Sequence, residues 1–170
     1  MAITTDRLII RKLREDDAEF IHKLVNQKSW LKYIGTRNVN NLDDAKNYIQ
    51  KINDDMYKTH GVGLWCVTLK ETKQAIGIAG LIKRDTLDHL DLGFAILDKF
   101  AKNGFISESC QAIIEFAKYN TEEDRILAIA MPNNRKSHKV LIKLGFAKIG
   151  NIENHQQKDV LNLFELKLAI

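Results

Sequence analysis

The chain has 170 residues, 45% of them hydrophobic and 28% charged, and 26 Lys and Arg against 22 Asp and Glu give a net charge of +4. This composition is that of a folded globular protein, and the length suits one domain spanning residues 1–170. No apolar stretch approaches the roughly 20 residues of a membrane-spanning helix, and no secretory signal pattern opens the chain, so we expect a cytoplasmic protein without membrane contact.

The first half of the chain predicts a strand, two helices and three more strands. The strand covers residues 7–13, and the acidic run Glu15–Asp17 that follows favours the start of a helix by its effect on the helix dipole. A second helix is predicted from Asn41, with an apolar stripe typical of a buried helix face. Strand patterns then occur at 64–69, 75–82 and 90–97, with short connections that indicate an antiparallel meander.

The second half alternates helices and strands. A long helix is predicted after Gly104, a buried strand at 126–130, and a helix at 134–144 that stops at Gly145. Two final strands, 147–152 and 159–168, flank a polar loop at 153–158. The order predicts an α+β (mixed α/β) fold with about seven strands and about four helices, and not a doubly wound Rossmann sheet.

Residues 91–109 form a strand, a polar turn and the start of a helix, which is a pattern suited to anion binding. The first amides of a helix have no intrahelical partner, and together with the helix dipole they attract phosphate. Gly104 permits close approach of a phosphate and Lys102 adds charge. The plainer interpretation is that Gly104 only eases the turn. Because both G-x-G-x-x-G and the Walker motif are absent, a nucleotide-binding Rossmann or NTPase site is excluded.

The stretch 133–146 is an amphipathic helix with a basic face and a glycine stop. Asn134 is a candidate N-cap, and a basic run of this kind is commonly a solvated face. Cys66 and Cys110 lie in apolar surroundings without metal-ligand spacing, so we expect reduced, buried thiols and no metal site.

Four motifs resemble one enzyme family. The segment from Asn134 to Phe146 resembles the N-x-x-S-x-x-v-L-x-K-L-G-F segment of GNAT acetyltransferases. Residues 5–11 resemble the T-x-R-L-x-L-R opening of the RimJ/RimL-type branch, which acetylates ribosomal-protein N-termini. Residues 90–94 resemble that branch's A-E-I-G-Y strand, and residues 103–109 its K-G-Y-A-T-E-A. The motifs lie in the family's order along nearly the whole chain.

The resemblance implies a splayed GNAT sheet that holds acetyl-coenzyme A (acetyl-CoA) between the third meander strand and the strand at 126–130. The family's site residues then fall on three groups of positions. Backbone groups of Phe94, Ile96 and Leu97 would contact the acetyl-pantetheine arm, and Asn134 would also contact it, with Lys139 near the adenosine. Backbone amides would hold the diphosphate at Lys102, Asn103, Gly104, Phe105, Ile106 and Ser107.

This sequence departs from the family pattern at two places. The diphosphate motif Q/R-x-x-G-x-G/A has Ala101 at its first position and Ile106 at its last, so a polar side chain is lost and a bulky one is added. The tyrosine that many members carry after the position of Val140 is Leu141 here. A tyrosine acid is therefore not expected at that position.

The implied reaction is direct attack of an amine on the thioester, with backbone donors near Phe94 stabilising the oxyanion. Asp91 is the candidate base and Ser137 the candidate acid. The alternatives are that Asp91 is a polar strand residue or binds the ammonium, and that Ser137 contributes only a hydrogen bond. The candidate acceptor pocket contains Trp30, Tyr33, His60 and Trp65, although isolated aromatics are more often packing residues.

Three functions are compatible with the sequence. The first is an acetyl-CoA-dependent N-acetyltransferase that acts on a protein N-terminus or a small amine, as a monomer or homodimer. The second is a non-catalytic acyl-CoA-binding protein, motivated by the altered diphosphate motif. The third is a nucleic-acid-binding module, motivated by the basic run at 135–143. It ranks last, so no nucleic-acid partner is expected.

Overall fold

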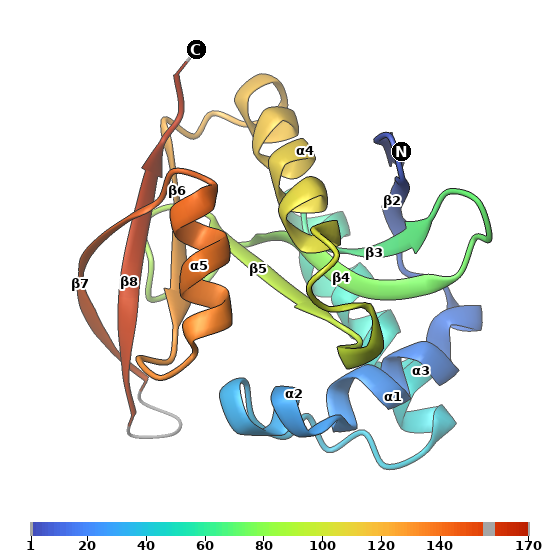
Figure 1. Cartoon of the computed structure of the whole chain (residues 1–170). Coiled ribbons are helices and arrows are strands. Elements are labelled where there is room, and N and C mark those ends of the chain that lie inside the picture. The colour runs from blue at the N-terminus through green and yellow to red at the C-terminus, as the bar shows by residue number, and fades with distance from the viewer. Residues whose placement is uncertain (1, 155–158, 170) are drawn as a thin grey trace.

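The computed structural model describes residues 2–154 and 159–169 and shows one mixed sheet with helices on both faces (Figure 1). Within these residues the strand order is β1-β2-β3-β4-β5-β6-β8-β7, and every neighbouring pair is antiparallel except β5 and β6. The strands are β1 (Ala2–Thr4), β2 (Leu8–Lys12), β3 (Leu64–Leu69), β4 (Ala75–Ile82), β5 (Asp91–Ile96), β6 (Arg125–Ala130), β7 (Ala147–Asn154) and β8 (Asp159–Lys167).

The helices confirm the predicted order and add short segments to it. The α-helices are α1 (Ala18–Asn26), α2 (Lys28–Tyr33), α3 (Leu42–Ile52), α4 (Phe105–Asn120) and α5 (Arg135–Lys143). Two 3-10 turns, η1 (Glu15–Asp17) and η3 (Asp98–Phe100), and a π-helix, η2 (Asn53–Lys58), complete the helical elements of the described residues. The mixed α+β fold is therefore confirmed, with β1, α2 and η2 as additions.

The unpredicted elements are short. β1 has 3 residues and α2 has 6, so neither is long enough to show a clear hydrophobic period. β7 extends to Asn154, two residues beyond its predicted end, so the predicted loop begins later than expected. The remainder of that loop, residues 155–158, lies outside the described residues.

Asp17 has a structural role that its place in the acidic run did not predict. Its carboxylate is buried and accepts hydrogen bonds from Arg11 at 2.8 and 2.9 Å and from the Arg14 amide at 2.8 Å. The run therefore forms a 3-10 turn before α1. The hydrogen bonds from Arg11 to Asp17 also connect this turn to β2, in addition to any favourable effect on the helix dipole.

The core lies between the sheet and its helices. On one face, Trp65 of β3 meets Phe116 of α4 edge-on, with ring centroids 5.4 Å apart. On the other face α1 packs against α3 and reaches β4. Cys66 and Cys110 are free and buried, which confirms the prediction, and burial raises the pKa of Cys66 to about 12, so its thiolate is disfavoured.

The sheet opens between β5 and β6, as the predicted splay requires. These parallel strands are paired at one position, Asp91 opposite Leu127, where the Leu127 amide donates to the Leu90 carbonyl at 2.9 Å. The ribbons then diverge toward the end of β5 (Figure 1). β6 meanwhile stays paired with β8 from Arg125 to Ala130. The free edge of β5 therefore faces the opening.

In the described part of the chain, no helix has the length and apolar character needed to cross a membrane.

Candidate active site

The register of β4 and β5 decides which backbone groups of β5 reach the opening. The Leu97 amide donates to Ile76 of β4 at 2.8 Å, and the paired positions run back to Ile82 opposite Asp91. Hydrogen bonding in an antiparallel pair alternates along the strand. Phe94 and Ile96 therefore direct their amides and carbonyls away from β4, toward the opening.

The end of β5 is fixed by a side chain from the α1–α2 junction. Gln27 Nε2 donates to the Ile96 carbonyl at 2.8 Å, and Gln27 Oε1 accepts from the Asp98 amide at 3.1 Å. Ser29 adds a hydrogen bond to the Asp98 carboxylate at 2.8 Å. Leu97 has both backbone groups in protein hydrogen bonds, because its carbonyl accepts from Phe100 at 2.9 Å. The groups directed into the opening are thus the Phe94 amide and carbonyl and the Ile96 amide.

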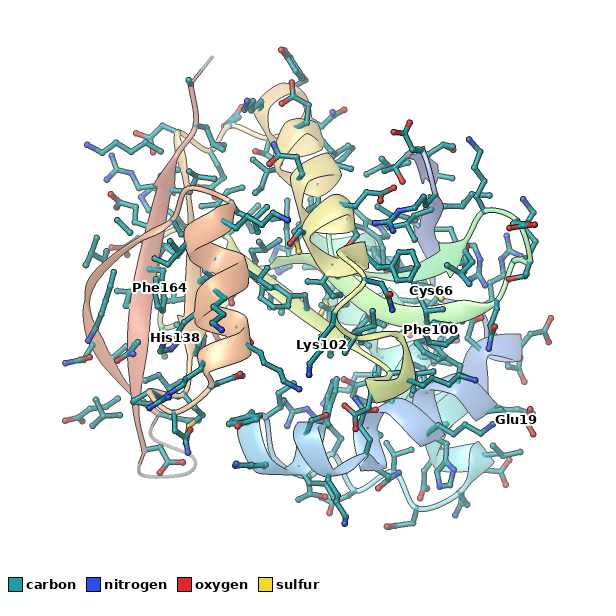
Figure 2. The ribbon with its side chains drawn as sticks, viewed as in Figure 1. Glu19, Cys66, Phe100, Lys102, His138 and Phe164 are labelled. Carbon is teal, nitrogen blue, oxygen red and sulfur yellow. The ribbon has the colours of Figure 1, made fainter. Side chains whose placement is uncertain are left out.

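The loop ahead of α4 has the conformation of an anion site. Lys102 and Gly104 have left-handed φ angles of 66° and 78°, and Lys102 lies exposed on this loop (Figure 2). The first intrahelical hydrogen bond of α4 runs from the Glu108 amide to the Gly104 carbonyl at 3.0 Å. The amides of Phe105 to Ser107 precede it, so they belong to the donors that a helix leaves unpaired. Alternating backbone conformations of this kind make concave anion sites.

Helix α5 places the second group of predicted residues. Asn134 caps it, with its side-chain oxygen accepting from the Ser137 amide at 3.3 Å, and Ser137 is half-buried. Lys139 is exposed on the same helix. Leu141, at the family's tyrosine position, is only 1% exposed and packs in the core. His138 turns inward to Phe164 of β8, with ring centroids 5.2 Å apart (Figure 2).

Asp91 is a buried carboxyl at the start of β5, where the two strands separate. Its side chain is 1% exposed, and Arg84 Nε lies 3.0 Å from its Oδ1. Burial raises the pKa of Asp91 to about 6, because desolvation of the carboxylate outweighs the opposing effect of Arg84. A carboxyl with this pKa is ionised in most molecules at neutral pH and is a stronger base than an ordinary aspartate.

The strand register also places Asp91 and Phe94 on opposite faces of the sheet. Trp65, which contacts α4, lies opposite Ala79, and Ala79 lies opposite Phe94. Directly opposed residues share a face and successive residues alternate. Phe94 therefore faces α4, and Asp91 faces the side of α1 and α3.

The aromatic acceptor candidates differ in exposure. Trp65 is 2% exposed and lies between Tyr57 and Phe116 in the core. Trp30 is 4% exposed, and its indole donates to the Gly35 carbonyl at 3.0 Å. Tyr33 at the end of α2 is half-buried, and His60 is exposed. Both tryptophans are thus packing residues, whereas Tyr33 and His60 are at least partly exposed.

The comparisons with known proteins agree with this geometry. Residues 7–147 match the family model described as an acetyltransferase (GNAT) domain. The uncharacterized N-acetyltransferase YoaA of Bacillus subtilis (strain 168) is 26% identical over 158 residues, covering 92% of this chain and 89% of that protein. The ribosomal protein uS5 alanine N-acetyltransferase of Escherichia coli (strain K12) is 30% identical over 87 residues, covering 50% of this chain and 45% of that protein.

A solved structure gives the same fold over the full length. It is the RimL ribosomal-protein α-N-acetyltransferase in complex with coenzyme A, with a TM-score of 0.84 at 16% identity, covering 99% of this chain and 98% of that chain.

A sheet that splays beside a free strand edge, followed by a loop with unpaired amides at a helix start, is the arrangement expected of a GNAT-type acyltransferase. The chain belongs to the GNAT acetyltransferase family and is an N-acetyltransferase. Membership in this family implies acetyl-CoA as the acetyl donor. The residues present fit that donor, since the free backbone groups of the β5 edge could pair with its amides and the unpaired amides ahead of α4 could bind its diphosphate.

Proposed function

We propose that this protein transfers the acetyl group of acetyl-CoA to an α-amine by direct attack of the amine, with Asp91 as the base. The observation that carries the proposal is the arrangement at the splay. The free backbone groups of Phe94 and Ile96 face the opening, while the buried carboxyl of Asp91 lies three residues before Phe94 on the opposite face. Acetyl-CoA and the acceptor amine could thus approach β5 from opposite faces of the sheet.

Acetyl-CoA, when bound, supplies an activated acetyl thioester. The Phe94 amide, directed into the opening, would hydrogen-bond the acetyl carbonyl, and the Ile96 amide would bind the pantetheine arm. Amides between Lys102 and Ser107 would hold the diphosphate, through Asn103, Gly104, Phe105 and Ile106. Asn134 would contact the pantetheine and Lys139 the adenosine end. In such a site, fixed donors aimed at developing charge contribute more than mobile ones.

The raised pKa of Asp91 favours an α-amine as acceptor. A reference α-amine has a pKa of about 7.7–8.0, whereas lysine is near 10.4. A base with a pKa of about 6 removes a proton from an α-ammonium group at a much lower free-energy cost than from a lysine ammonium group. The name of the uS5 alanine N-acetyltransferase describes transfer to an alanine of a ribosomal protein, which agrees with an α-amine acceptor.

Two further residues have smaller roles in the proposal. Ser137 would donate a hydrogen bond to the departing thiolate, although a thiol with a pKa near 8.5 leaves with little protonation. Tyr33, the partly accessible aromatic residue of α2, would line the acceptor side.

The proposal is tested by measuring thiol release from acetyl-CoA with two matched peptides. One has a free α-amine and no lysine, and the other has a blocked N-terminus and one lysine. We expect faster release with the first. Preference for the lysine peptide would contradict the role given to Asp91. Binding of acetyl-CoA without release, over a broad panel of amines, would support the non-catalytic alternative suggested by Ala101 in the diphosphate motif.

A further inference from the structure

A side chain from the connection between β1 and β2 reaches the loop ahead of α4. Arg7 Nη1 donates to the Asn103 carbonyl at 2.9 Å, and the guanidinium lies over the Phe105 ring, 4.4 Å from its centroid. These two contacts lie on either side of Gly104 in the chain. Arg7 is thus hydrogen-bonded to the segment whose amides are proposed to bind the diphosphate, although it is 96 positions away from Asn103 in sequence.

Glu108, in the first turn of α4, holds this arginine in place. Its carboxylate lies 2.7 Å from Arg7 Nε, and it also accepts from the Arg7 amide at 2.9 Å and from the Thr5 hydroxyl at 2.6 Å. Partial burial acts to raise the pKa of Glu108, but the hydrogen bonds from Thr5 and Arg7 outweigh it and hold that pKa below its usual value. The carboxylate is therefore ionised, and the guanidinium is fixed at both Nε and Nη1.

The contact with Asn103 sets the direction of the next amide. In a trans peptide the carbonyl and the following N–H point in opposite directions. Because Arg7 binds the Asn103 carbonyl, the Gly104 amide points away from Arg7. The left-handed φ angles of Lys102 and Gly104 complete the concave arrangement of amides.

The remaining nitrogen of Arg7 lies beside the glycine itself. A methyl group built on Gly104 would come within 3.4 Å of Nη2. Among the described residues, Nη2 has no protein acceptor within hydrogen-bonding distance, whereas Nε and Nη1 both have one. The loop's own side chain at the motif's first position is Ala101, which carries no donor. The Arg7 guanidinium thus brings a positive charge to the loop, in which Ala101 supplies no polar side chain.

We propose that Arg7 is a positioning residue of the diphosphate site for coenzyme A, and that Glu108 and Thr5 hold it in place. The inference rests on the proposed use of acetyl-CoA. Arg7 acts in two ways: its contact with Asn103 orients the Gly104 amide, and its positive charge beside Gly104 favours a diphosphate at the loop electrostatically. A planar guanidinium suits both tasks, because several donors act at once in a fixed geometry.

The test compares two ligands by calorimetry on the full chain. Coenzyme A carries the diphosphate, and pantetheine is the same arm without it. Arg7→Ala should weaken the binding of coenzyme A by about tenfold or more, because the Gly104 amide loses its fixed orientation and a nearby positive charge is removed. It should leave the binding of pantetheine unchanged within about twofold. It should also reduce the salt dependence of coenzyme A binding, since a positive charge near the diphosphate is lost.

The matched control is Arg125→Ala. Arg125 also makes two ion pairs, with Asp124 at 2.9 Å and Glu165 at 3.2 Å, but it lies at the start of β6, after the far end of α4. This variant should bind coenzyme A as the wild type does. Arg7→Lys and Glu108→Gln should give smaller losses in the same direction, because each keeps part of the contact set. They carry the test if Arg7→Ala does not fold.

Three results would overturn the inference. The first is wild-type affinity for coenzyme A in folded Arg7→Ala. The second is equal weakening of coenzyme A and pantetheine, which would mean general damage to the site. The third is a loss in Arg125→Ala as large as that in Arg7→Ala. A wild-type protein that binds no coenzyme A at all would instead reject the proposed function, so the two failures are distinguishable.

Discussion

Replacing Asp91 with asparagine tests the central electrostatic feature of the site. The carboxyl is 1% exposed, and burial raises its pKa to about 6 from an ordinary 3.8. A shift of about two pKa units corresponds to roughly 3 kcal/mol of free energy, on a scale of about 1.4 kcal/mol per unit. Asparagine has nearly the same shape and does not ionise, so it removes this cost while keeping the volume.

The sign of the pH dependence follows from the direction of the shift. A carboxyl whose pKa is raised by folding stabilises the protein fully below its unfolded pKa, and this stability is lost as the pH rises through about 6. Of the roughly 3 kcal/mol, about 2 kcal/mol is lost between pH 4.5 and 7.5. The free energy of unfolding of Asp91→Asn, relative to the wild type, should therefore increase by about that amount over the same interval.

Urea denaturation at several pH values measures this difference directly. The control is Asp85→Asn, which makes the same chemical change at an exposed position in the same β4–β5 connection. Parallel stability curves for Asp91→Asn and the wild type would refute the reasoning, because they would show that the Asp91 pKa does not change on folding. In the activity assay, Asp91→Asn should slow acetyl transfer and lose the rise in rate across pH 6.

Three further substitutions test other parts of the site. Gly104→Asp places a side chain at φ 78° and a negative charge at the diphosphate loop, so coenzyme A affinity should fall at least tenfold by calorimetry. The control is Gly150→Asp, where an added Cβ meets no atom within 4 Å; this variant should bind coenzyme A with wild-type affinity. Gln27→Ala removes both hydrogen bonds to the end of β5 and should raise KM for acetyl-CoA by about tenfold with a smaller change in kcat. Gln50→Ala, which removes a side-chain hydrogen bond to Asp54 on the surface of α3, should leave both KM and kcat unchanged. Ser137→Ala should lower kcat less than about tenfold, because a thiol leaves readily; a hundredfold drop would make Ser137 an essential acid.

Much of the fold could be predicted because its signals are local. The helix predicted from Asn41, for example, is α3, and the Asn41 side chain caps it by accepting from the Asp44 amide at 2.8 Å. Gly104 precedes α4 with a left-handed φ, which a glycine at a strand-to-helix turn suggests. The sequence motifs also predicted membership in the GNAT family, which the match of the family model to residues 7–147 confirms.

The sequence by itself determined the order of the longer elements, the buried thiols and the residue types at the site. Only the tertiary structure decided which β5 amides reach the opening, that Trp65 packs in the core, and that Asp91 is desolvated. It also brought Gln27 to β5 and Arg7 to the loop before α4. Periodicity and capping depend on residues a few positions apart, whereas strand order, burial and the resulting pKa values depend on contacts between distant segments.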